Sequence, residues 1–258
     1  MTEKQVTGGR VAMITGASAG IGRALAVKLA RDGWQVAVCA RREEALRAIA
    51  EEFPELADHL HPFPLDVTDV AESKAVFMAV EADLGEVDTL ILNAGDYDPM
   101  TLDEFDPDLF RRLAEVNYLG AVNGIGAALG PMRERGRGQI LVTASLSAYR
   151  GLPQAAPYGA SKAAVLNMAE SLRPALEGTG VSLRVINPGF VKTRLTEKNR
   201  FHMPQLLTPE AAAEYIHQEI DDGGFEIVFP KRFGYTLKFM RLLPYRLYFW
   251  LTRRMVQS

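Results

Sequence analysis

Short apolar runs alternate along this chain with longer segments of helical periodicity. Seven such runs occupy residues 9–15, 34–40, 61–67, 87–95, 137–145, 180–189 and 223–230. Apolar residues at helical spacing, glycine stops and capping residues mark the segments between them. Strands joined through helices require crossover connections, which favour a parallel sheet covered by helices on both faces. We therefore expect a single doubly wound α/β domain with a seven-stranded parallel sheet.

The junction between the first apolar run and the first helical segment is rich in glycine. Such a turn lets the backbone approach a pyrophosphate closely, while the helix that follows offers free N–H groups and the positive end of its dipole. The spacing is G-x-x-x-G-x-G instead of the general G-x-G-x-x-G, but the strand-to-helix junction is the context that the motif requires. We interpret the turn as a dinucleotide site formed by Gly16, Ser18, Ala19, Gly20, Ile21 and Gly22.

A tyrosine and a lysine, Tyr158 and Lys162, lie four residues apart in the predicted helix 156–172. Residues at this spacing share one helix face. An ammonium beside a phenol lowers the pKa of the phenol, which would make Tyr158 a usable general acid or base. Ser145 lies at the end of the run 137–145 and could hydrogen-bond the same reacting oxygen. Because this spacing also occurs by chance, its weight depends on the motifs that accompany it.

Four short sequence motifs follow one another along the chain. They are Thr-Gly-x-x-x-Gly-Ile-Gly at residues 15–22, Asn-Ala-Gly at 93–95, Tyr-x-x-x-Lys at 158–162 and Pro-Gly-x-x-x-Thr at 188–193. Over roughly residues 8–222 the chain thereby resembles the classical short-chain dehydrogenase/reductase family. The resemblance implies a Rossmann-type fold and nicotinamide-dependent redox chemistry on a small molecule. It also extends the expected cofactor site to Asn93, Ala94, Gly95, Tyr158, Lys162, Pro188, Gly189, Val191 and Thr193.

The same resemblance implies a catalytic set of four residues. Ser145 matches the serine that binds the carbonyl, Tyr158 the proton donor, Lys162 the lysine and Asn117 the helix asparagine of the family. Ser147 is the rival for the serine role, but the family spacing of thirteen residues before the tyrosine favours Ser145. Taken alone, Asn117 would be read as an ordinary polar helix residue.

Two arginines at the end of the second predicted strand bear on the choice of nicotinamide. Arg41 and Arg42 stand where relatives that prefer NAD carry a carboxylate, and guanidiniums can pair with a 2′-phosphate. We expect NADP(H) to be preferred over NAD(H), although the arginines could instead pair with Glu43 and Glu44. Asp66 and Val67 resemble the family's adenine-contacting pair, while Asp66 or Thr68 could equally cap the next helix.

The C-terminal segment differs in composition from the rest of the chain. Residues 231–258 contain seven Lys or Arg and no Asp or Glu, whereas the whole chain has a formal net charge of −3. We therefore divide the chain into an NADP-binding catalytic domain, residues 1–230, and a basic, aromatic-rich extension, residues 231–258. Two short amphipathic helices separated by Pro244 could lie on an anionic membrane surface. Alternatively, they pack on the domain, close the substrate pocket or form a subunit interface.

The remaining features narrow the function further. The overall negative charge argues against nucleic acid as a partner, and the histidines show no spacing that suggests a metal site. No signal-peptide pattern begins the chain, and the single cysteine, Cys39, cannot form an internal disulfide, so we expect a cytoplasmic protein.

The apolar residues of the loop 190–207 favour a lipophilic substrate. The family resemblance suggests a homodimer or homotetramer through the helices that carry Asn117 and Tyr158.

We therefore expect an oxidoreductase that transfers hydride between NADP(H) and a carbonyl or secondary alcohol. Two other classes of function remain open at this point. One is a catalytically silent NADP-binding regulatory protein, and the other is a protein that docks to a membrane or partner through its basic extension. The presence of both Tyr158 and Lys162 argues for turnover.

Overall fold

The computed structural model describes residues 9–199, 201 and 203–253. Seven strands form one parallel sheet in the order β3-β2-β1-β4-β5-β6-β7, which confirms the predicted architecture. Most of these strands are nearly continuous runs of buried residues, as expected for a sheet that is covered on both faces. The strands are β1 Val11–Thr15, β2 Gln35–Ala40, β3 Leu60–Pro64, β4 Thr89–Leu92, β5 Gly138–Thr143, β6 Val181–Pro188 and β7 Glu226–Phe229.

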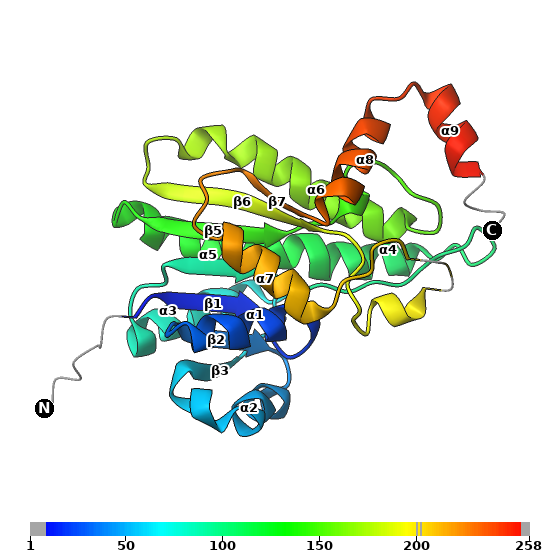
Figure 1. Ribbon diagram of the computed structural model, residues 1–258. Helices are drawn as coiled ribbons and strands as arrows, with labels where there is room; N and C mark the ends of the chain where they lie inside the picture. Colours follow the sequence, from blue (N-terminus) through cyan, green and yellow to red (C-terminus); the bar gives the residue numbers. More distant parts are fainter. Residues whose placement is uncertain (1–8, 200, 202, 254–258) are drawn as a thin grey trace, which may run out of the picture.

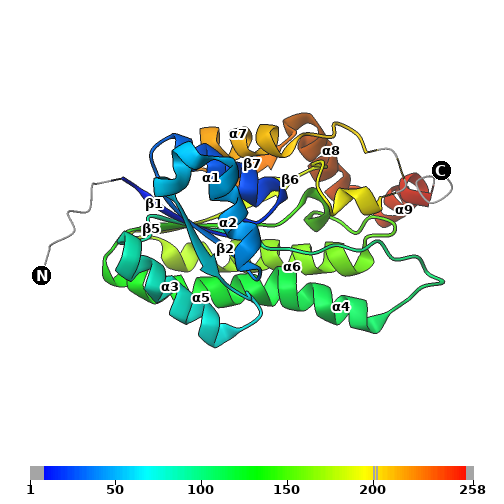
Figure 2. The same cartoon turned by 90° about the horizontal axis from the view of Figure 1, so that it is seen from below.

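Helices cover both faces of the sheet and create two separate hydrophobic cores (Figure 1, Figure 2). One face carries α1 Gly20–Arg31, α2 Glu43–Glu52 and α7 Pro209–Glu219. The other carries α3 Val70–Leu84, α4 Pro107–Ala114, α5 Gly120–Glu134 and α6 Ala156–Leu172. The sequence explains where α7 begins, because the Thr208 side chain accepts a hydrogen bond from the Ala211 amide and Pro209 is the first residue of the helix.

The order of the strands determines where a ligand can enter. The chain runs outward from β1 through β2 to β3 and then returns to place β4 on the opposite side of β1. In open parallel sheets such a reversal leaves a crevice outside the carboxyl ends of the two central strands. The glycine turn follows β1 and the Asn-Ala-Gly motif follows β4, so both motifs lie at this reversal.

The helical segment that begins at Pro107 and ends at Glu134 contains a local interruption. A π-helical turn, Glu115–Leu119, separates α4 from α5. Asn117 lies at the centre of this turn, and its side chain bonds to the chain that leaves β4. Periodicity alone could not predict the widened turn, because apolar spacing is similar on either side of it; such turns are frequent at functional sites.

The cap of α3 also differs from our expectation. Neither Asp66 nor Thr68 caps this helix, because Asp69 is the N-cap and its side chain accepts a hydrogen bond from the Glu72 amide. The carboxylate of Asp66 instead accepts bonds from the amide and the hydroxyl of Thr68, which close a local turn. The capping alternative is therefore wrong for both residues.

Two further helices follow the sheet, as the sequence predicted. They are α8 Lys231–Arg241 and α9 Tyr245–Arg253, with Pro244 between them; Arg254 and the residues beyond it lie outside the described residues. Both helices lie at the end of the molecule toward which the strands run (Figure 1, Figure 2). Within the described parts of the chain, no helix is both long and apolar enough to cross a membrane.

Candidate active site

The glycine turn forms a close-fitting cradle after β1. A Cβ atom at Gly16 would lie 2.7 Å from the Cα of Ala94, and one at Gly22 would lie 2.5 Å from the carbonyl oxygen of Gly16. Gly16 and Gly20 also have positive φ angles of 67° and 57°, which disfavour other residues. A side chain at Gly16 or Gly22 would therefore collide with the backbone that packs against this turn, which lies at the N-terminus of α1. The cradle therefore fits a pyrophosphate, whose approach requires bare backbone.

Residues after β4 hold this cradle in place. The Asn93 side chain donates hydrogen bonds to the carbonyl oxygens of Thr15 and Gly16, at 3.3 and 3.4 Å. The Thr15 hydroxyl accepts bonds from the amides of Asn93 and Ala94, both at 3.1 Å. Thr15 was not among the predicted site residues, although it begins the Thr-Gly motif. Asn93 and Thr15 thus join the two loops on either side of the strand reversal.

Ser145 and Ser147, which are buried, and Tyr158, which is partly buried, form a hydroxyl cluster at the carboxyl end of β5. The Ser147 hydroxyl and amide donate hydrogen bonds to the Ser145 Oγ, at 3.0 and 3.2 Å. The Ser145 side chain in turn hydrogen-bonds Tyr158, which lowers the pKa of the phenol and partly offsets the increase that burial causes. Ser147 therefore contacts Ser145, while Ser145 makes the contact with Tyr158.

Lys162 reaches into the same cluster from one turn further along α6. Its Nζ atom donates a hydrogen bond of 2.8 Å to the carbonyl oxygen of Thr143 and lies 5.9 Å from the centroid of the Tyr158 ring. Burial lowers the pKa of Lys162 from 10.5 to about 8. We expected the lysine to lower the pKa of Tyr158, but in this structure burial raises that pKa and the Ser145 hydrogen bond provides the opposing effect.

Asn117 closes the cluster from the π-helical turn. Its amide group donates hydrogen bonds to the Asp96 carbonyl oxygen and to the Ser161 hydroxyl, both at 2.9 Å, and its Oδ1 atom accepts one from the Asp96 amide at 2.7 Å. A Cβ at Gly95 would lie 3.2 Å from the Asn117 Oδ1 and 3.4 Å from the Lys162 Nζ. The structure thus brings all four predicted catalytic residues together beside the Asn-Ala-Gly loop.

Comparison with known proteins identifies the family. The family model described as short chain dehydrogenase matches residues 10–203. The chain belongs to the short-chain dehydrogenase family. It is 36% identical to an uncharacterized oxidoreductase of Myxococcus xanthus, an alignment that covers 95% of this chain and 97% of the relative. The protein is therefore an oxidoreductase of that family.

Solved structures show the same fold. A short-chain dehydrogenase from Streptomyces avermitilis is 26% identical, superposes with a TM-score of 0.82 and aligns over 97% of this chain and 98% of that chain. An alcohol dehydrogenase from the archaeon Thermococcus sibiricus, complexed with 5-hydroxy-NADP, is 30% identical with a TM-score of 0.76, over 85% of this chain and 95% of that chain. Both confirm the Rossmann-type architecture of this short-chain dehydrogenase.

Two guanidiniums of the short-chain dehydrogenase lie exposed after β2. In the part of the chain that the structure describes, neither Arg41 nor Arg42 takes part in an ion pair. Glu43, one of the two carboxylates that we considered as their partner, bonds to Arg47 instead, at 2.9 Å. Hydrogen bonds from Thr68 lower the pKa of Asp66, which follows the next strand, and the positive charge of Arg41 adds a smaller effect in the same direction. Both arginines therefore remain available to an anionic group.

Val67 and Thr193, two residues of the predicted cofactor site, each lie against a glycine. A Cβ at Gly120 in α5 would lie 2.8 Å from a Val67 methyl group, and Asn123 donates a 2.9 Å hydrogen bond to the Val67 carbonyl oxygen. The methyl group of Thr193 lies 2.9 Å from the position that a Cβ at Gly20 would take. The loop after β6 thus contacts the glycine turn after β1.

The carboxyl end of β6, which precedes Thr193, is hydrogen-bonded to the end of the neighbouring strand β7. The Gly189 amide donates a 2.7 Å hydrogen bond to the Phe229 carbonyl oxygen at the end of β7. Val191 is buried and pairs with Leu207 as an isolated bridge, which returns the loop 190–207 to the sheet; we call this loop the substrate loop after its expected role. Pro188 ends β6 and precedes this turn. These contacts place the Pro-Gly-x-x-x-Thr motif beside the cradle.

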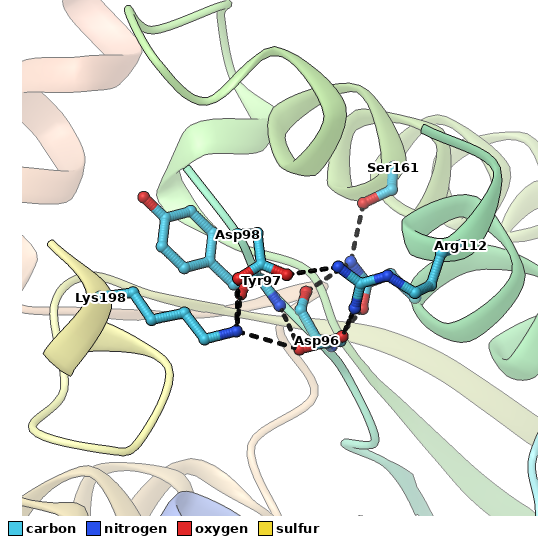
Figure 3. A network of polar contacts seen from close by, with 7 residues as sticks. Asp96, Tyr97, Asp98, Arg112, Ser161 and Lys198 are labelled. Carbon is cyan, nitrogen blue, oxygen red and sulfur yellow. Dashed lines mark hydrogen bonds and ion pairs between the residues drawn. The ribbon is translucent and has the colours of Figure 1, made fainter. Parts of the chain in front are cut away.

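A charged cluster that sequence reasoning missed connects the Asn-Ala-Gly loop to the substrate loop (Figure 3). Asp98 bonds to Lys198 at 2.6 Å and also to Arg112, which bonds to Asp96 as well. Lys198 also donates a 2.6 Å hydrogen bond to the carbonyl oxygen of Tyr97. Charged residues directly after a strand were the only available signal, since Lys198 is 100 residues away in the sequence. The cluster fixes the chain from which the Tyr97 side chain projects.

The substrate loop of the short-chain dehydrogenase contributes aromatic rings. Phe190 packs edge-on against Phe201, with 5.7 Å between their centroids, and stacks on Phe233 of α8 at 5.8 Å. Leu207 packs against the core of the sheet, whereas the Leu206 side chain is exposed. The predicted apolar loop therefore supplies one aromatic cluster, and α8 completes it. Phe233 was not predicted, because nothing in the sequence links it to Phe190.

Proposed function

We propose that this short-chain dehydrogenase transfers hydride between NADP(H) and a lipophilic carbonyl or the corresponding secondary alcohol. The observation that supports this most directly is the convergence of Ser145, Tyr158, Lys162 and Asn117 beside a glycine cradle. Such a cradle fits a pyrophosphate, and a phenol with hydroxyl and ammonium neighbours fits a proton donor. When bound, the nicotinamide cofactor supplies the hydride.

In this mechanism Tyr158 and Ser145 act on the substrate oxygen. During reduction, negative charge develops on the carbonyl oxygen, and hydrogen bonds from the two side chains stabilise that charge. Tyr158 then gives its phenolic proton to the oxygen, which completes the alcohol. Ser147 bonds to Ser145 on its other side, so the Ser145 hydroxyl hydrogen remains free for the substrate or for Tyr158.

Lys162 and Asn117 support the proton donor in this proposal. A lysine with a pKa of about 8 can bind or release a proton near neutral pH, so it can help to restore the proton that Tyr158 has given away. The ammonium form also favours the phenolate. Asn117 holds the Asn-Ala-Gly loop against α6 through Asp96 and Ser161, which keeps Lys162 directed at the cluster.

We infer a preference for NADP(H) from Arg41 and Arg42. The two guanidiniums carry no ion pair in the described residues, and β2 ends in no carboxylate that would hold a free ribose hydroxyl. Their fork of donors matches the oxygens of a phosphate. The related alcohol dehydrogenase from Thermococcus sibiricus was solved with 5-hydroxy-NADP, which is consistent with this choice.

We further propose a homodimer or homotetramer. The outer surfaces of α4, α5 and α6 lie on one face of the molecule and are available to a second copy (Figure 2). Light scattering coupled to size-exclusion chromatography tests this directly. A monomeric mass for the purified protein would contradict it.

The proposed reaction is tested with the pair Tyr158→Phe and wild type. NADPH and NADH binding is measured by fluorescence, and turnover is measured on a panel of aliphatic and aromatic ketones. We expect NADPH to bind more tightly than NADH, and the substitution to lower kcat by roughly 100- to 10,000-fold while NADPH binding is kept. Failure of both nucleotides to bind would contradict the cofactor site. NADPH binding without turnover on any ketone would contradict the reductase.

A further inference from the structure

The helices α8 and α9 each have an inner face that packs on the domain. Leu237 is buried against the core, and Tyr248 is buried and donates a hydrogen bond to the Gly151 carbonyl oxygen. Arg150 donates hydrogen bonds to the carbonyl oxygens of Met240 and Leu243, both at 2.7 Å, and its guanidinium lies over the Tyr248 ring. The alternative that the extension packs on the domain is therefore correct for this inner face.

The outer face of the same helices remains uncovered and is rich in large apolar side chains. Tyr235, Phe239 and Leu242 follow one another at spacings of four and three residues, so they lie on one side of α8. Their exposed fractions are 58%, 64% and 79%. On α9, Tyr245 and Phe249 repeat this spacing and stack on each other with 5.7 Å between their centroids. Together with Leu247 and Trp250, which are also exposed, these residues form what we call the outer face.

Basic side chains accompany these apolar residues. Three of the basic residues on the two helices reach a carboxylate of the domain: Lys231 pairs with Glu219, Lys238 with Glu226, and Arg241 approaches Glu170 at 4.0 Å. In the part of the chain that the structure describes, Arg232, Arg246 and Arg253 take part in no ion pair. The outer face thus combines exposed aromatic and aliphatic groups with unpaired positive charge and no acidic residue.

We propose that the outer face of α8 and α9 docks on an anionic lipid membrane surface. Tyrosine, tryptophan and arginine side chains are suited to the headgroup region, and leucine and phenylalanine to the acyl boundary below it. Anionic headgroups complement the three unpaired guanidiniums. The helices are short, but their inner faces already hold them on the domain, so they need no membrane in order to fold.

A second copy of this chain fits the outer face less well than an anionic membrane does. A twofold interface places the same patch of both subunits in contact. Here that would bring two sets of basic side chains together with no acidic residue between them. The residues of the outer face belong to α8 and α9, whereas we propose oligomerisation through α4, α5 and α6.

Docking in this orientation would bring the substrate loop close to the bilayer. The two helices and the described residues of the substrate loop lie at the same end of the molecule (Figure 1, Figure 2). Phe233 on α8 stacks directly on Phe190 of that loop. A lipophilic carbonyl dissolved in the membrane would then reach the loop without crossing water. This delivery rests on the proposed reductase function, whereas the docking itself does not.

The docking is tested by flotation of the full-length protein with vesicles of phosphatidylcholine alone or with added phosphatidylglycerol. We expect flotation only with the anionic vesicles, and its loss at high salt, since screening weakens the attraction. Arg232→Gln/Arg246→Gln should lower partitioning about 30-fold, because each basic residue near an anionic surface contributes about fivefold. The matched control Lys74→Gln/Arg133→Gln also removes two exposed charges, on α3 and α5, and should bind as wild type does.

A second pair tests the apolar contribution. Phe239→Ser/Leu242→Ser should lower partitioning by at least tenfold, whereas Met78→Ser/Leu102→Ser, which removes exposed apolar groups elsewhere, should not. Circular dichroism and turnover on a water-soluble ketone are measured on every variant. Lack of flotation with anionic vesicles, or equal flotation of the outer-face and control variants, would overturn the docking. Turnover is measured separately from flotation. Absence of turnover in the wild-type protein would therefore contradict the reductase and leave the docking result intact.

The mass of the protein in solution tests the competing explanation, which is that the outer face is a subunit interface. If Phe239→Ser/Leu242→Ser halves the mass of the protein in solution while wild type does not float, the outer face is a subunit interface. That result would also overturn the proposal. An unchanged mass together with lost flotation supports it.

Discussion

The ring of Tyr97 meets the ring of Tyr158 edge-on, with 5.0 Å between their centroids and an interplanar angle of 84°. The Tyr97 hydroxyl donates a 2.6 Å hydrogen bond to the Oδ1 of Asn199. One side chain thereby contacts both the proposed proton donor and the substrate loop. Burial raises the pKa of Tyr97 to about 12, so its phenol stays protonated and keeps donating this bond.

Tyr97→Phe and Tyr97→Ala should separate these two contacts. The phenylalanine variant keeps the edge-on ring and loses the bond to Asn199, so we expect KM to rise up to about tenfold while kcat changes little. The alanine variant also removes the ring packing on Tyr158, and kcat should fall up to about tenfold as well. Steady-state kinetics on a ketone substrate measure both. Unchanged kcat in Tyr97→Ala would show that the ring does not position Tyr158.

Lys162 should make the stability of the protein depend on pH. Its pKa is lowered from 10.5 to about 8, so the folded state binds this proton more weakly than the unfolded state. The cost of burying the ammonium is complete below the folded pKa and disappears as pH rises toward the unfolded pKa; it amounts to about 3 kcal/mol. Urea unfolding of wild type and Lys162→Met at several pH values measures this. The stability of wild type relative to the variant should increase with pH.

Comparing the wild type with Lys162→Met cancels the contributions that other titrating groups make to the pH dependence of stability. Burial raises the pKa of the Cys39 thiol and of the Tyr97 phenol. For these acids the unfolded state loses its proton first, so they lower stability at high pH. Both proteins carry them, and their contributions cancel in the difference. A difference that does not change with pH would contradict the buried ammonium.

Arg41→Ala/Arg42→Ala should change the cofactor preference and little else. Loss of two charge-assisted contacts to a phosphate should weaken NADPH binding by roughly 10- to 100-fold, whereas NADH binding should not change. Arg47→Ala is the matched control, because Arg47 is an exposed arginine on the next helix that pairs with Glu43. Fluorescence titration measures both affinities. An equal loss for NADPH and NADH would contradict a role in phosphate recognition.

Two glycine-to-alanine substitutions should have opposite effects on stability. At Gly22 a Cβ would lie 2.5 Å from the Gly16 carbonyl oxygen and 2.6 Å from the Asn93 Nδ2, so Gly22→Ala should cost about 1–3 kcal/mol and weaken NADPH binding. At Gly126, in α5, a Cβ would meet nothing within 4 Å, so Gly126→Ala should stabilise by about 0.5–1 kcal/mol. Urea unfolding and nucleotide titration check both. Normal nucleotide binding by Gly22→Ala would contradict the cradle.

Local patterns in the sequence determined the elements and their order. Buried runs identify strands because both faces of a parallel sheet are covered, and the spacing of Tyr158 and Lys162 places them on one helix face because an α-helix repeats every 3.6 residues. The glycine turn is equally local, since it requires bare backbone within a few residues. These features were predictable because short-range sterics and periodicity control them.

Tertiary structure decided what depends on residues far apart in the chain. Tyr97 and Asn199 are 102 residues apart, and no local pattern links them. Likewise the lowered pKa of Lys162 follows from its burial, and the cap of α3 at Asp69 depends on where the chain turns after β3. Contacts and solvent exclusion arise only when the strands meet at the sheet. The sequence therefore predicted which residues enter the site, while packing determined their partners and their ionisation.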